Sequence, residues 1–486
     1  SCNLVTLVVA EGGSGGNTFE SLENHPDRVH SLPGYPVPLP SPWYSGYLTY
    51  TLEGRTIHTH YILVEAQDDD HHEKPLIYWS NGGPGASSMF GLLTELGPLL
   101  FSDESLLTDG YFESGIPTPI YNPHTWTRLG SILLFDAPAP VGFSYCDNQV
   151  GDNCLRWTDE LAATNTFMAF RTFYETFPMY RKKKLFLTGE SYAGIYIPTL
   201  ARLMLRHNQE QTETIPLEGF AVGDACMGSE TSICADLVGK EEKQSFFHAL
   251  FLAGHHQIPL QTMARVFRAC GGPVGTKTST TACKEAMNKV MEQAGGFYEY
   301  HLYDDCTYED GVRRRLQPDL SLIRHDYPCG GDNVMLEYLA LKEVKEALHI
   351  SSQTDFYETD NAEGFDYSYT EPDLQPFYKE VAGQLRVLVY NGDADPSINS
   401  FEAQNWTSHL GLPETQSWRP WTLDGCRRMG GYVTRYEGDF DFLTIRGSGH
   451  LVPTYKPEAA FAFLKSWIDN EDYPAYKPNC VEPEES

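Results

Sequence analysis

The sequence predicts an α/β protein with a largely parallel, doubly wound sheet. Five short apolar runs have the pattern of strands that are buried on both faces, and they lie at 76–79, 132–135, 185–187, 387–390 and 442–445. Helical patterns over 158–176, 195–206 and 457–468 follow several of these runs. Strands that alternate with helices in this way are typical of a sheet covered by helices on both faces.

The first 40 residues differ in composition from the rest, and we expect them to form a flexible leader. They are rich in the loop-forming residues glycine and proline, at positions 12, 13, 15, 16, 33, 36, 38 and 40. The apolar run 4–10 is either the remnant of a signal peptide or a strand. The absence of an initial Met favours the remnant.

The remainder is expected to form one α/β core, in two parts at 41–224 and 331–486, with an insertion at 225–330. The first part opens with an antiparallel hairpin around Glu53 and Gly54. The insertion has helical stretches, no strong strand pattern, and cysteines at 226, 234, 270, 283 and 306. Because it interrupts the core between strands, we expect a cap above the carboxyl edge of the sheet, where ligands bind in such folds.

Charge and cysteine content restrict the class of protein. The formal net charge is −31, from 35 Lys and Arg against 66 Asp and Glu, and such a surface repels nucleic acid and anionic lipid. No stretch approaches the roughly 20 apolar residues of a membrane span. Eleven cysteines and the glycosylation sequon Asn405-Trp406-Thr407 indicate an oxidising compartment. We expect a lysosomal, vacuolar or secreted protein with no nucleic-acid or membrane partner.

A serine nucleophile is predicted at Ser191. The stretch 189–194, Gly-Glu-Ser-Tyr-Ala-Gly, follows one predicted strand and opens a helix, which is the setting of a nucleophile elbow in α/β-hydrolases. Small residues at Gly189, Ala193 and Gly194 let the strand and helix approach each other. The alternative is a glycine-rich turn without chemistry. A second match around Ser14 lies in the leader with no strand before it, and we expect it to be inert.

An acid and a base follow in the chain order of this fold, Ser, acid, His. Asp395 lies just after the strand at 387–390, and His450 follows the strand at 442–445. Both therefore end at the same sheet edge as Ser191, where an imidazole oriented by a carboxylate can take the serine proton. Taken singly, Asp395 could form a turn and His450 could be structural. The backbone N–H groups of Gly83 and Tyr192 are the predicted oxyanion hole, unless residues 82–85 are only a tight Gly-Pro loop.

The chain resembles the serine carboxypeptidases, and most closely their lysosomal branch, from Tyr44 to about Ile468. The matching stretches are 81–85, 91–95, 142–145, 185–199, 391–395 and 449–453. The resemblance implies Ser191, Asp395 and His450 as the catalytic triad. It also implies that the substrate's C-terminal carboxylate is bound by a group of four residues: Asn81, Glu95, Glu190 and the supporting Trp79.

The sequence departs from that family at three positions. Ala86 stands where the family has a cysteine, with no cysteine over 355–365 to pair with it; Pro140 replaces a glycine, and Asp224 replaces an asparagine. The resemblance implies disulfides Cys270–Cys283 and Cys306–Cys329, each worth roughly 3 kcal/mol in the chain-entropy model. Pairs Cys146–Cys154 and Cys226–Cys234 are further hypotheses. The odd total leaves at least one cysteine free or intermolecular.

The predicted function is release of C-terminal residues from peptides through an acyl-enzyme, with highest activity at acidic pH. We expect no cofactor and no metal, because the histidines at 71, 72, 255 and 256 lack further ligands at suitable spacing. The partner is a peptide substrate, and a homodimer is left open. Two alternatives remain: an esterase or acyltransferase on the same scaffold, and a protein that protects other lysosomal enzymes.

Overall fold

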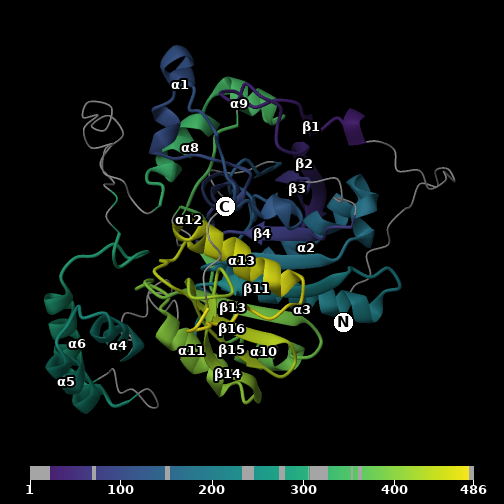
Figure 1. Cartoon of the computed structure of the whole chain (residues 1–486). Coiled ribbons are helices and arrows are strands. Elements are labelled where there is room, and N and C mark those ends of the chain that lie inside the picture. The colour runs from purple at the N-terminus through teal and green to yellow at the C-terminus, as the bar shows by residue number, and fades with distance from the viewer. Residues whose placement is uncertain are drawn as a thin grey trace.

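The computed structural model describes residues 22–67, 73–147, 154–231, 246–272, 280–304, 306, 327–351, 354–359 and 364–480. The described chain forms a mixed sheet of twelve strands with helices on both faces (Figure 1). The strand order is β1-β2-β3-β7-β4-β10-β11-β13-β16-β15-β14, and β8 pairs with β3.

The middle of the sheet consists of six parallel strands. They are β7 (Ser131–Phe135), β4 (Leu76–Ser80), β10 (Leu185–Glu190), β11 (Leu217–Gly223), β13 (Arg386–Gly392) and β16 (Phe440–Ile445). Neighbouring apolar side chains are in register, since Leu187 lies opposite Tyr78 on one side and Phe220 on the other. The carboxyl ends of all six strands therefore meet at one edge of the sheet.

Antiparallel strands complete both ends of the sheet. On one side are β1 (Arg28–Val29), β2 (Trp43–Leu52), β3 (Arg55–Val64) and β8 (Tyr145–Cys146); on the other are β15 (Met429–Tyr436) and β14 (Glu414–Thr422). Two short pairs lie apart from the sheet: β5 (Leu99–Leu100) with β6 (Ile120–Tyr121), and β9 (Trp157–Thr158) with β12 (Tyr367–Ser368).

Two apolar clusters cover the two faces of the sheet. Successive residues of β13 alternate between them, with Val387 and Val389 in one and Leu388 in the other, as the period of two in a strand requires. The first face carries α2 (Asp159–Thr176), α3 (Ala193–Glu210), α10 (Gln375–Val381) and α11 (Ser400–His409); the second carries α8 (Gly331–Leu339), α9 (Lys342–Ala347), α12 (Val452–Tyr455) and α13 (Pro457–Ile468).

Short helical segments complete the core. They are α1 (Asp109–Ser114), the 3₁₀ turns η1 (Leu22–Asn24), η3 (Asp103–Leu106), η4 (Trp126–Arg128) and η5 (Pro178–Lys182), and the π-helical segment η2 (Gly91–Leu96). π-helical turns are rare and often occur at functional sites. The segment η2 carries Glu95, one of the predicted site residues.

The insertion forms a helical cap, as the sequence predicts. Its helices α4 (Phe246–Gly254), α5 (Leu260–Cys270) and α6 (Thr281–Ala294) pack around their own apolar cluster, and they stand beside the core in teal in Figure 1. The disulfide Cys270–Cys283 joins α5 to α6. The cap then returns to the sheet edge, where His450 N donates to the Tyr300 carbonyl at 2.7 Å.

The five core strands and three helices expected from the sequence are all present. The strands β11, β14 and β15 were not predicted. The sequence of β11 contains Glu218 and two glycines, and a Cβ at Gly219 would lie 2.4 Å from the Arg386 carbonyl, so this strand needs glycine where it meets β13. The outer strand β14 is largely exposed and polar, and therefore lacks the apolar signal of a buried strand.

The prediction of a flexible leader over 1–40 is wrong for its second half. Residues 1–21, including the apolar run 4–10 and Ser14, lie outside the described residues. Parts of the segment 22–40 pack on the core: β1 pairs with β2, Val29 and Leu32 are buried, and Asp27 accepts a hydrogen bond from the Tyr61 hydroxyl at 2.7 Å. Prolines and glycines here shape an ordered segment on the core.

The predicted disulfides Cys146–Cys154, Cys270–Cys283 and Cys306–Cys329 are confirmed. Cys226 is also disulfide-bonded, and its predicted partner Cys234 lies outside the described residues. The disulfide Cys426–Cys480 was not predicted; it closes a loop of 54 residues at the C-terminal end.

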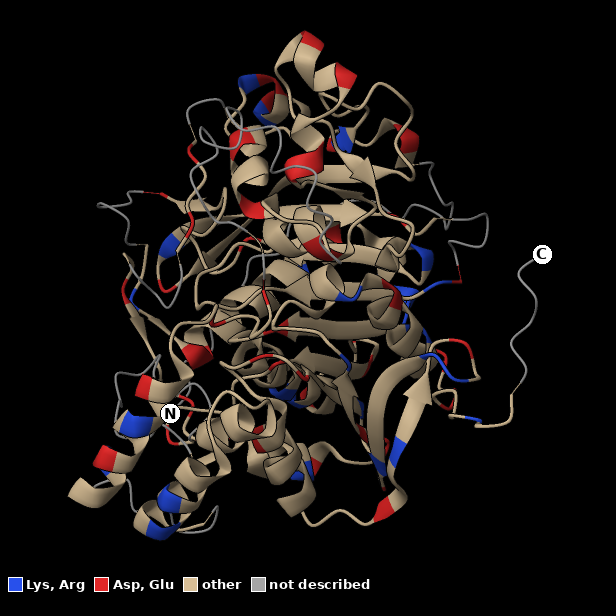
Figure 2. Cartoon of the chain, turned by 60° about the vertical axis from the view of Figure 1, so that its left-hand side comes forward, with Lys and Arg blue, Asp and Glu red and all other residues tan. Residues whose placement is uncertain are grey.

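Figure 2 shows acidic residues spread over the helices and loops of the core and the cap rather than gathered in one patch. This distribution agrees with a uniformly acidic protein of net charge −31. Among the described residues, no helix combines the length and apolar character needed to cross a bilayer.

Candidate active site

Ser191 lies on a sharp turn between β10 and α3. Its backbone has φ of 61°, a left-handed conformation that costs free energy for a residue other than glycine and occurs mainly at functional sites. The Ser191 N–H donates to the Gly223 carbonyl of the adjacent strand at 2.9 Å. A Cβ at Gly189 would lie 2.5 Å from the Ser80 carbonyl, and one at Gly194 would lie 2.4 Å from the Cys226 carbonyl. These glycines therefore allow the turn, as predicted.

Asp395 and His450 form a hydrogen-bonded pair at the same sheet edge. His450 Nδ1 lies 2.7 Å from Asp395 Oδ2, and the two residues are 2% and 0% exposed. Asp395 also accepts from the backbone N–H groups of Ser397 and Ile398, at 2.8 and 3.2 Å, so its carboxylate is fixed. His450 Nε2 makes no hydrogen bond within the described part of the chain. That nitrogen is available to accept a proton.

A second carboxyl group, that of Asp224, lies beside this pair. It follows β11, has φ of 42°, and is fully buried. Carboxyl oxygens of Asp224 and Asp395 and a ring nitrogen of His450 all lie within 4.8 Å of one another. Asp224 Oδ1 accepts from Asn391 Nδ2 at 3.1 Å and from the Gly392 N–H at 3.0 Å. Burial, followed by the neighbouring Asp395 charge, raises the pKa of Asp224 well above its ordinary value.

The backbone of the loop after β4 passes close to Tyr192. A Cβ at Gly82 would lie 2.3 Å from Tyr192 N and 2.9 Å from Ser191 Cβ. Gly83 has φ of 99°, a conformation that glycine adopts freely. Within the described residues, neither the Gly83 N–H nor the Tyr192 N–H donates a hydrogen bond. Two unused donors near the serine are what an oxyanion hole requires.

The four residues of the predicted carboxylate-binding group are in contact with one another. Asn81 Nδ2 donates to Glu95 Oε1 at 3.2 Å and to Glu190 Oε1 at 3.0 Å. Asn81 Oδ1 accepts from Trp79 Nε1 at 2.7 Å and from the Gly91 N–H at 3.0 Å, which fixes the orientation of the amide. All four side chains are buried. The residues come from β4, η2 and β10.

The two glutamates of this group cannot both ionise cheaply. Burial raises the pKa of Glu95 to about 7, and burial followed by the Glu95 charge raises the pKa of Glu190 well above its ordinary value. Each Oε2 atom lacks a donor among the described groups. Both carboxyls accept from the same Asn81 nitrogen, so they lie close together and the charge of Glu95 disfavours ionisation of Glu190. The pair therefore retains at least one proton at pH values where an ordinary glutamate is ionised.

The structure places Asp395 beside His450, Asn81 beside both glutamates, and the Gly82 backbone beside Ser191 and Tyr192. Charge interactions link the groups: the Asp395 charge contributes to the raised pKa of Glu190, after larger effects of burial, Glu95 and Asp224. Other candidates lie elsewhere. His255 Nδ1 lies 2.9 Å from the Phe251 carbonyl, and its ring packs on that of Phe251, while residues 68–72 lie outside the described residues. Sequence reasoning noted Asp224 only as a departure and missed the buried Asp159.

The sequence profile of the serine carboxypeptidases matches residues 33–470. The chain belongs to this family. It is 30% identical to the lysosomal protective protein of Mus musculus, over 92% of this chain and 94% of that protein. It is 27% identical to serine carboxypeptidase 1 of Hordeum vulgare, over 91% and 92%, and 31% identical to the P-(S)-hydroxymandelonitrile lyase of Sorghum bicolor, over 94% and 86%.

A solved structure agrees with this assignment at the level of the fold. The prohormone-processing carboxypeptidase of Saccharomyces cerevisiae matches with a TM-score of 0.66 and 18% identity, over 88% of this chain and 91% of that one. The expected α/β-hydrolase fold with a disulfide-bonded helical cap is confirmed. The protein is an enzyme of the serine carboxypeptidase family.

Proposed function

We propose that this enzyme releases single residues from the C-terminus of peptides through an acyl-enzyme, and that it works best at acidic pH. The observation that carries the proposal is the contact network of Asn81, Glu95 and Glu190 beside the Asp395–His450 pair. A serine hydrolase needs only the pair and a nucleophile. The buried glutamates are an additional feature, and they suit a substrate that ends in a carboxylate.

In the proposed reaction, Ser191 Oγ attacks the carbonyl carbon of the last peptide bond. His450 Nε2 takes the serine proton, while Asp395 holds the ring and stabilises the imidazolium. The N–H groups of Gly83 and Tyr192 bind the oxyanion of the tetrahedral intermediate. The C–N bond then breaks as His450 gives the proton to the leaving amine. A water molecule hydrolyses the resulting ester by the same sequence of proton transfers.

The leaving residue is recognised through its free carboxylate. The proton shared by Glu95 and Glu190 is the donor for that carboxylate, and Asn81 Nδ2 holds the two glutamates in place. When the shared proton is lost, the two glutamates repel the substrate in a buried site where charge interactions are strong. Because burial raises the pKa of both groups, binding is favoured at acidic pH and weakens as the pH rises.

The test compares three substrates with one blocked dipeptide sequence: the free acid, the C-terminal amide and the C-terminal methyl ester. A carboxypeptidase prefers the free acid at pH 5 by a factor of about 100 or more in kcat/KM over the amide, since a buried donor group would be left unpaired. Ser191→Ala is the control for background hydrolysis. Equal rates for acid and amide would contradict the proposal and favour the second candidate.

The second candidate is an esterase or acyltransferase on the same scaffold. It is favoured by one observation: the relatives include a protein named as a hydroxymandelonitrile lyase at 31% identity, so family membership alone does not set the reaction. Such an enzyme would retain Ser191, Asp395 and His450. Cleavage of the methyl ester with no hydrolysis of the free acid would identify it.

We also propose that the protein functions in a lysosome, vacuole or secreted fluid, because a site that needs protonated carboxyl groups suits an acidic compartment. The name of the mouse relative suggests a role in protecting other enzymes, and a homodimer is one arrangement for it. A protective role would not need the Ser191 hydroxyl. If the protected enzymes stay stable in the presence of the Ser191→Ala protein, the protective role does not depend on catalysis.

A further inference from the structure

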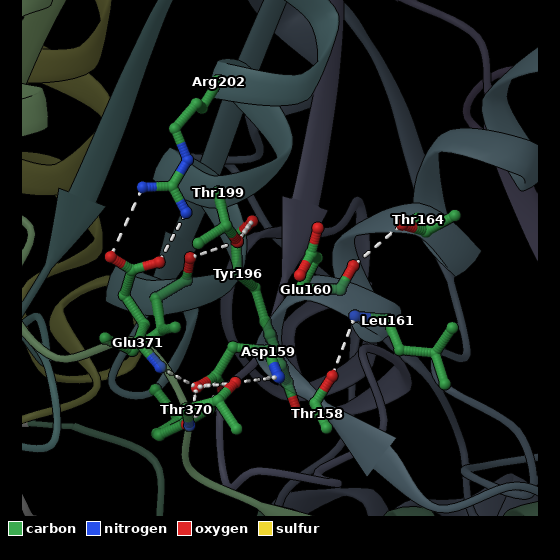
Figure 3. Close-up of polar contacts among 12 residues, drawn as sticks. Thr158, Asp159, Glu160, Leu161, Thr164, Tyr196, Thr199, Arg202, Thr370 and Glu371 are labelled. Atoms are coloured by element: carbon green, nitrogen blue, oxygen red, sulfur yellow. Dashed lines mark hydrogen bonds and ion pairs between the residues drawn. The ribbon is translucent and has the colours of Figure 1, made fainter. Parts of the chain in front are cut away.

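Asp159 is a buried carboxylate outside the proposed reacting groups, at the first turn of α2. It is 2% exposed, and Thr158 caps the helix by accepting from the Leu161 N–H. Figure 3 shows Asp159, at the start of α2, next to the segment that contains Thr370 and Glu371. Within the described residues it pairs with hydrogen-bond donors and no cation. The helix N-terminus and these donors therefore stabilise its charge.

One oxygen of this carboxylate binds two phenol groups. Asp159 Oδ1 accepts from the Tyr192 hydroxyl at 2.6 Å and from the Tyr367 hydroxyl at 2.8 Å. The Tyr192 side chain is buried, and its ring makes edge contacts with the rings of Tyr367 and Tyr369. Tyr192 is the residue directly after Ser191. Its ring is therefore anchored at a point remote from the turn that carries the serine.

The other oxygen binds a separate segment of backbone. Asp159 Oδ2 accepts from the Thr370 N–H at 2.5 Å and from the Glu371 N–H at 2.7 Å. The ion pair of Glu371 with Arg202 of α3, drawn in Figure 3, holds the same segment from the opposite side. The strand pair β9–β12 aligns Tyr367 with Trp157 just before this point. The carboxylate is thus held rigidly by α2 and by residues 367–371.

We propose that Asp159 is a positioning residue for the oxyanion hole, acting through the side chain of Tyr192. The inference rests on the proposed function, in which the Tyr192 N–H is one of two oxyanion donors. Such donors stabilise the transition state because they are fixed before the reaction begins, and small displacements reduce the rate strongly. The turn fixes the Tyr192 backbone at one end and the hydrogen bond to Asp159 fixes its ring at the other.

Two matched variants test this role. Tyr192→Phe and Tyr367→Phe each remove one hydroxyl from the same Asp159 oxygen, but only Tyr192 carries the oxyanion amide. We expect Tyr192→Phe to lower kcat about tenfold with KM within about twofold, a fraction of the effect of losing a whole donor. Tyr367→Phe should keep kcat within about twofold of the parent. Thermal unfolding of both variants measures the purely structural part.

A second readout separates positioning from general loosening of the site. A peptide boronic acid forms a tetrahedral adduct with the serine and places an oxygen in the oxyanion hole, so its affinity should fall by the same factor as kcat in Tyr192→Phe. The affinity for a free amino acid product, which occupies only the carboxylate-binding group, should stay within about twofold. In Asp159→Asn, whose amide places N–H donors opposite other donors, both kcat and boronate affinity should fall further.

Equal kcat values for Tyr192→Phe and Tyr367→Phe would overturn the inference and make Asp159 a structural anchor only. So would a loss of boronate affinity matched by the same loss for the amino acid. Failure of the proposed function would be seen differently, as activity retained in Ser191→Ala or as equal rates for the free acid and the amide. The two results can therefore be distinguished.

Discussion

Asp224 and Asp395 hold carboxyl oxygens within 4.8 Å of each other, and both residues are fully buried. Asp395 is the partner of His450, so a charge on Asp224 would lie next to the groups that transfer the proton in the proposed reaction. Two buried carboxyls this close cannot both ionise cheaply, and the pKa of Asp224 is raised. Protonation of Asp224 removes a like charge from beside the Asp395–His450 pair.

The first prediction concerns Asp224→Asn. Because the pKa of Asp224 is raised in the folded enzyme, its protonated form favours folding, and this stability is lost as the pH rises through the raised pKa. Each unit of upward pKa shift corresponds to about 1.4 kcal/mol of lost stability at higher pH. The asparagine keeps an acceptor for Gly392 and a donor for Asp395 without titrating. Between pH 4 and 8, the melting temperature of the variant should rise relative to that of the parent as the pH increases. A melting temperature that instead falls further below that of the parent would contradict a protonated Asp224.

The second prediction concerns the paired glutamates. The double variant Glu95→Gln and Glu190→Gln removes the titrating pair, whose raised pKa values limit binding of the terminal carboxylate at higher pH. The pH profile of kcat/KM for a peptide acid should therefore extend towards neutral pH in the variant. Hydrolysis of the matching ester, which lacks a free carboxylate, is the control and should keep the parent profile. An unchanged decline for peptides above pH 6 would remove the glutamates from substrate binding.

The third prediction concerns the nucleophile. Ser191→Ala should lower kcat by about 10⁴ or more, with a change in unfolding free energy of about 1 kcal/mol or less because only one oxygen is lost. A fluorophosphonate probe should label the Ser191 peptide in the parent enzyme and leave Ser14 unlabelled. Activity of the alanine variant within about tenfold of the parent would exclude Ser191 as the attacking group.

The fourth prediction concerns a buried pair away from the site. His60 Nδ1 lies 2.8 Å from Asp136 Oδ2, and both side chains are fully buried. Asp136→Asn should destabilise the protein by about 1–3 kcal/mol, because the amide turns N–H groups towards buried donors whose hydrogen bonds the carboxylate accepts. Asp469→Asn, which breaks the exposed pair with Lys465, is the control and should cost about 0.5 kcal/mol or less. Denaturant unfolding of both variants measures the difference, and equal small losses would contradict the prediction.

The sequence alone predicted the parts of the site that follow from local rules. Ser191, Asp395 and His450 each follow an apolar strand pattern, and parallel strands bring their carboxyl ends to one edge. The carboxylate-binding group came from the family resemblance, because Asn81 and Glu190 are 109 positions apart and no periodic pattern links them. Their contact depends on the neighbouring positions of β4 and β10 in the sheet.

Local sequence patterns do not predict the burial or the contacts of Asp159 and Asp224. Asp159 at the start of α2 has the pattern of an ordinary acidic residue in the first turn of a helix, and its burial results from a segment about 210 positions later in the chain. Asp224 differs from its family counterpart by a single group, and only the register of β11 with β13 places it beside Asp395. Long-range strand pairing decides both cases.

The position of β16 has a consequence for how the enzyme is made. His450 follows this strand, which lies between β13 and β15 and pairs with both. During synthesis the elbow with Ser191 is complete long before β16 has left the ribosome, and pairing between distant strands is a slow part of folding. The nascent chain therefore contains Ser191 before it contains the proposed base, His450. In the proposed mechanism, the chain gains its base only when almost all of it has been translated.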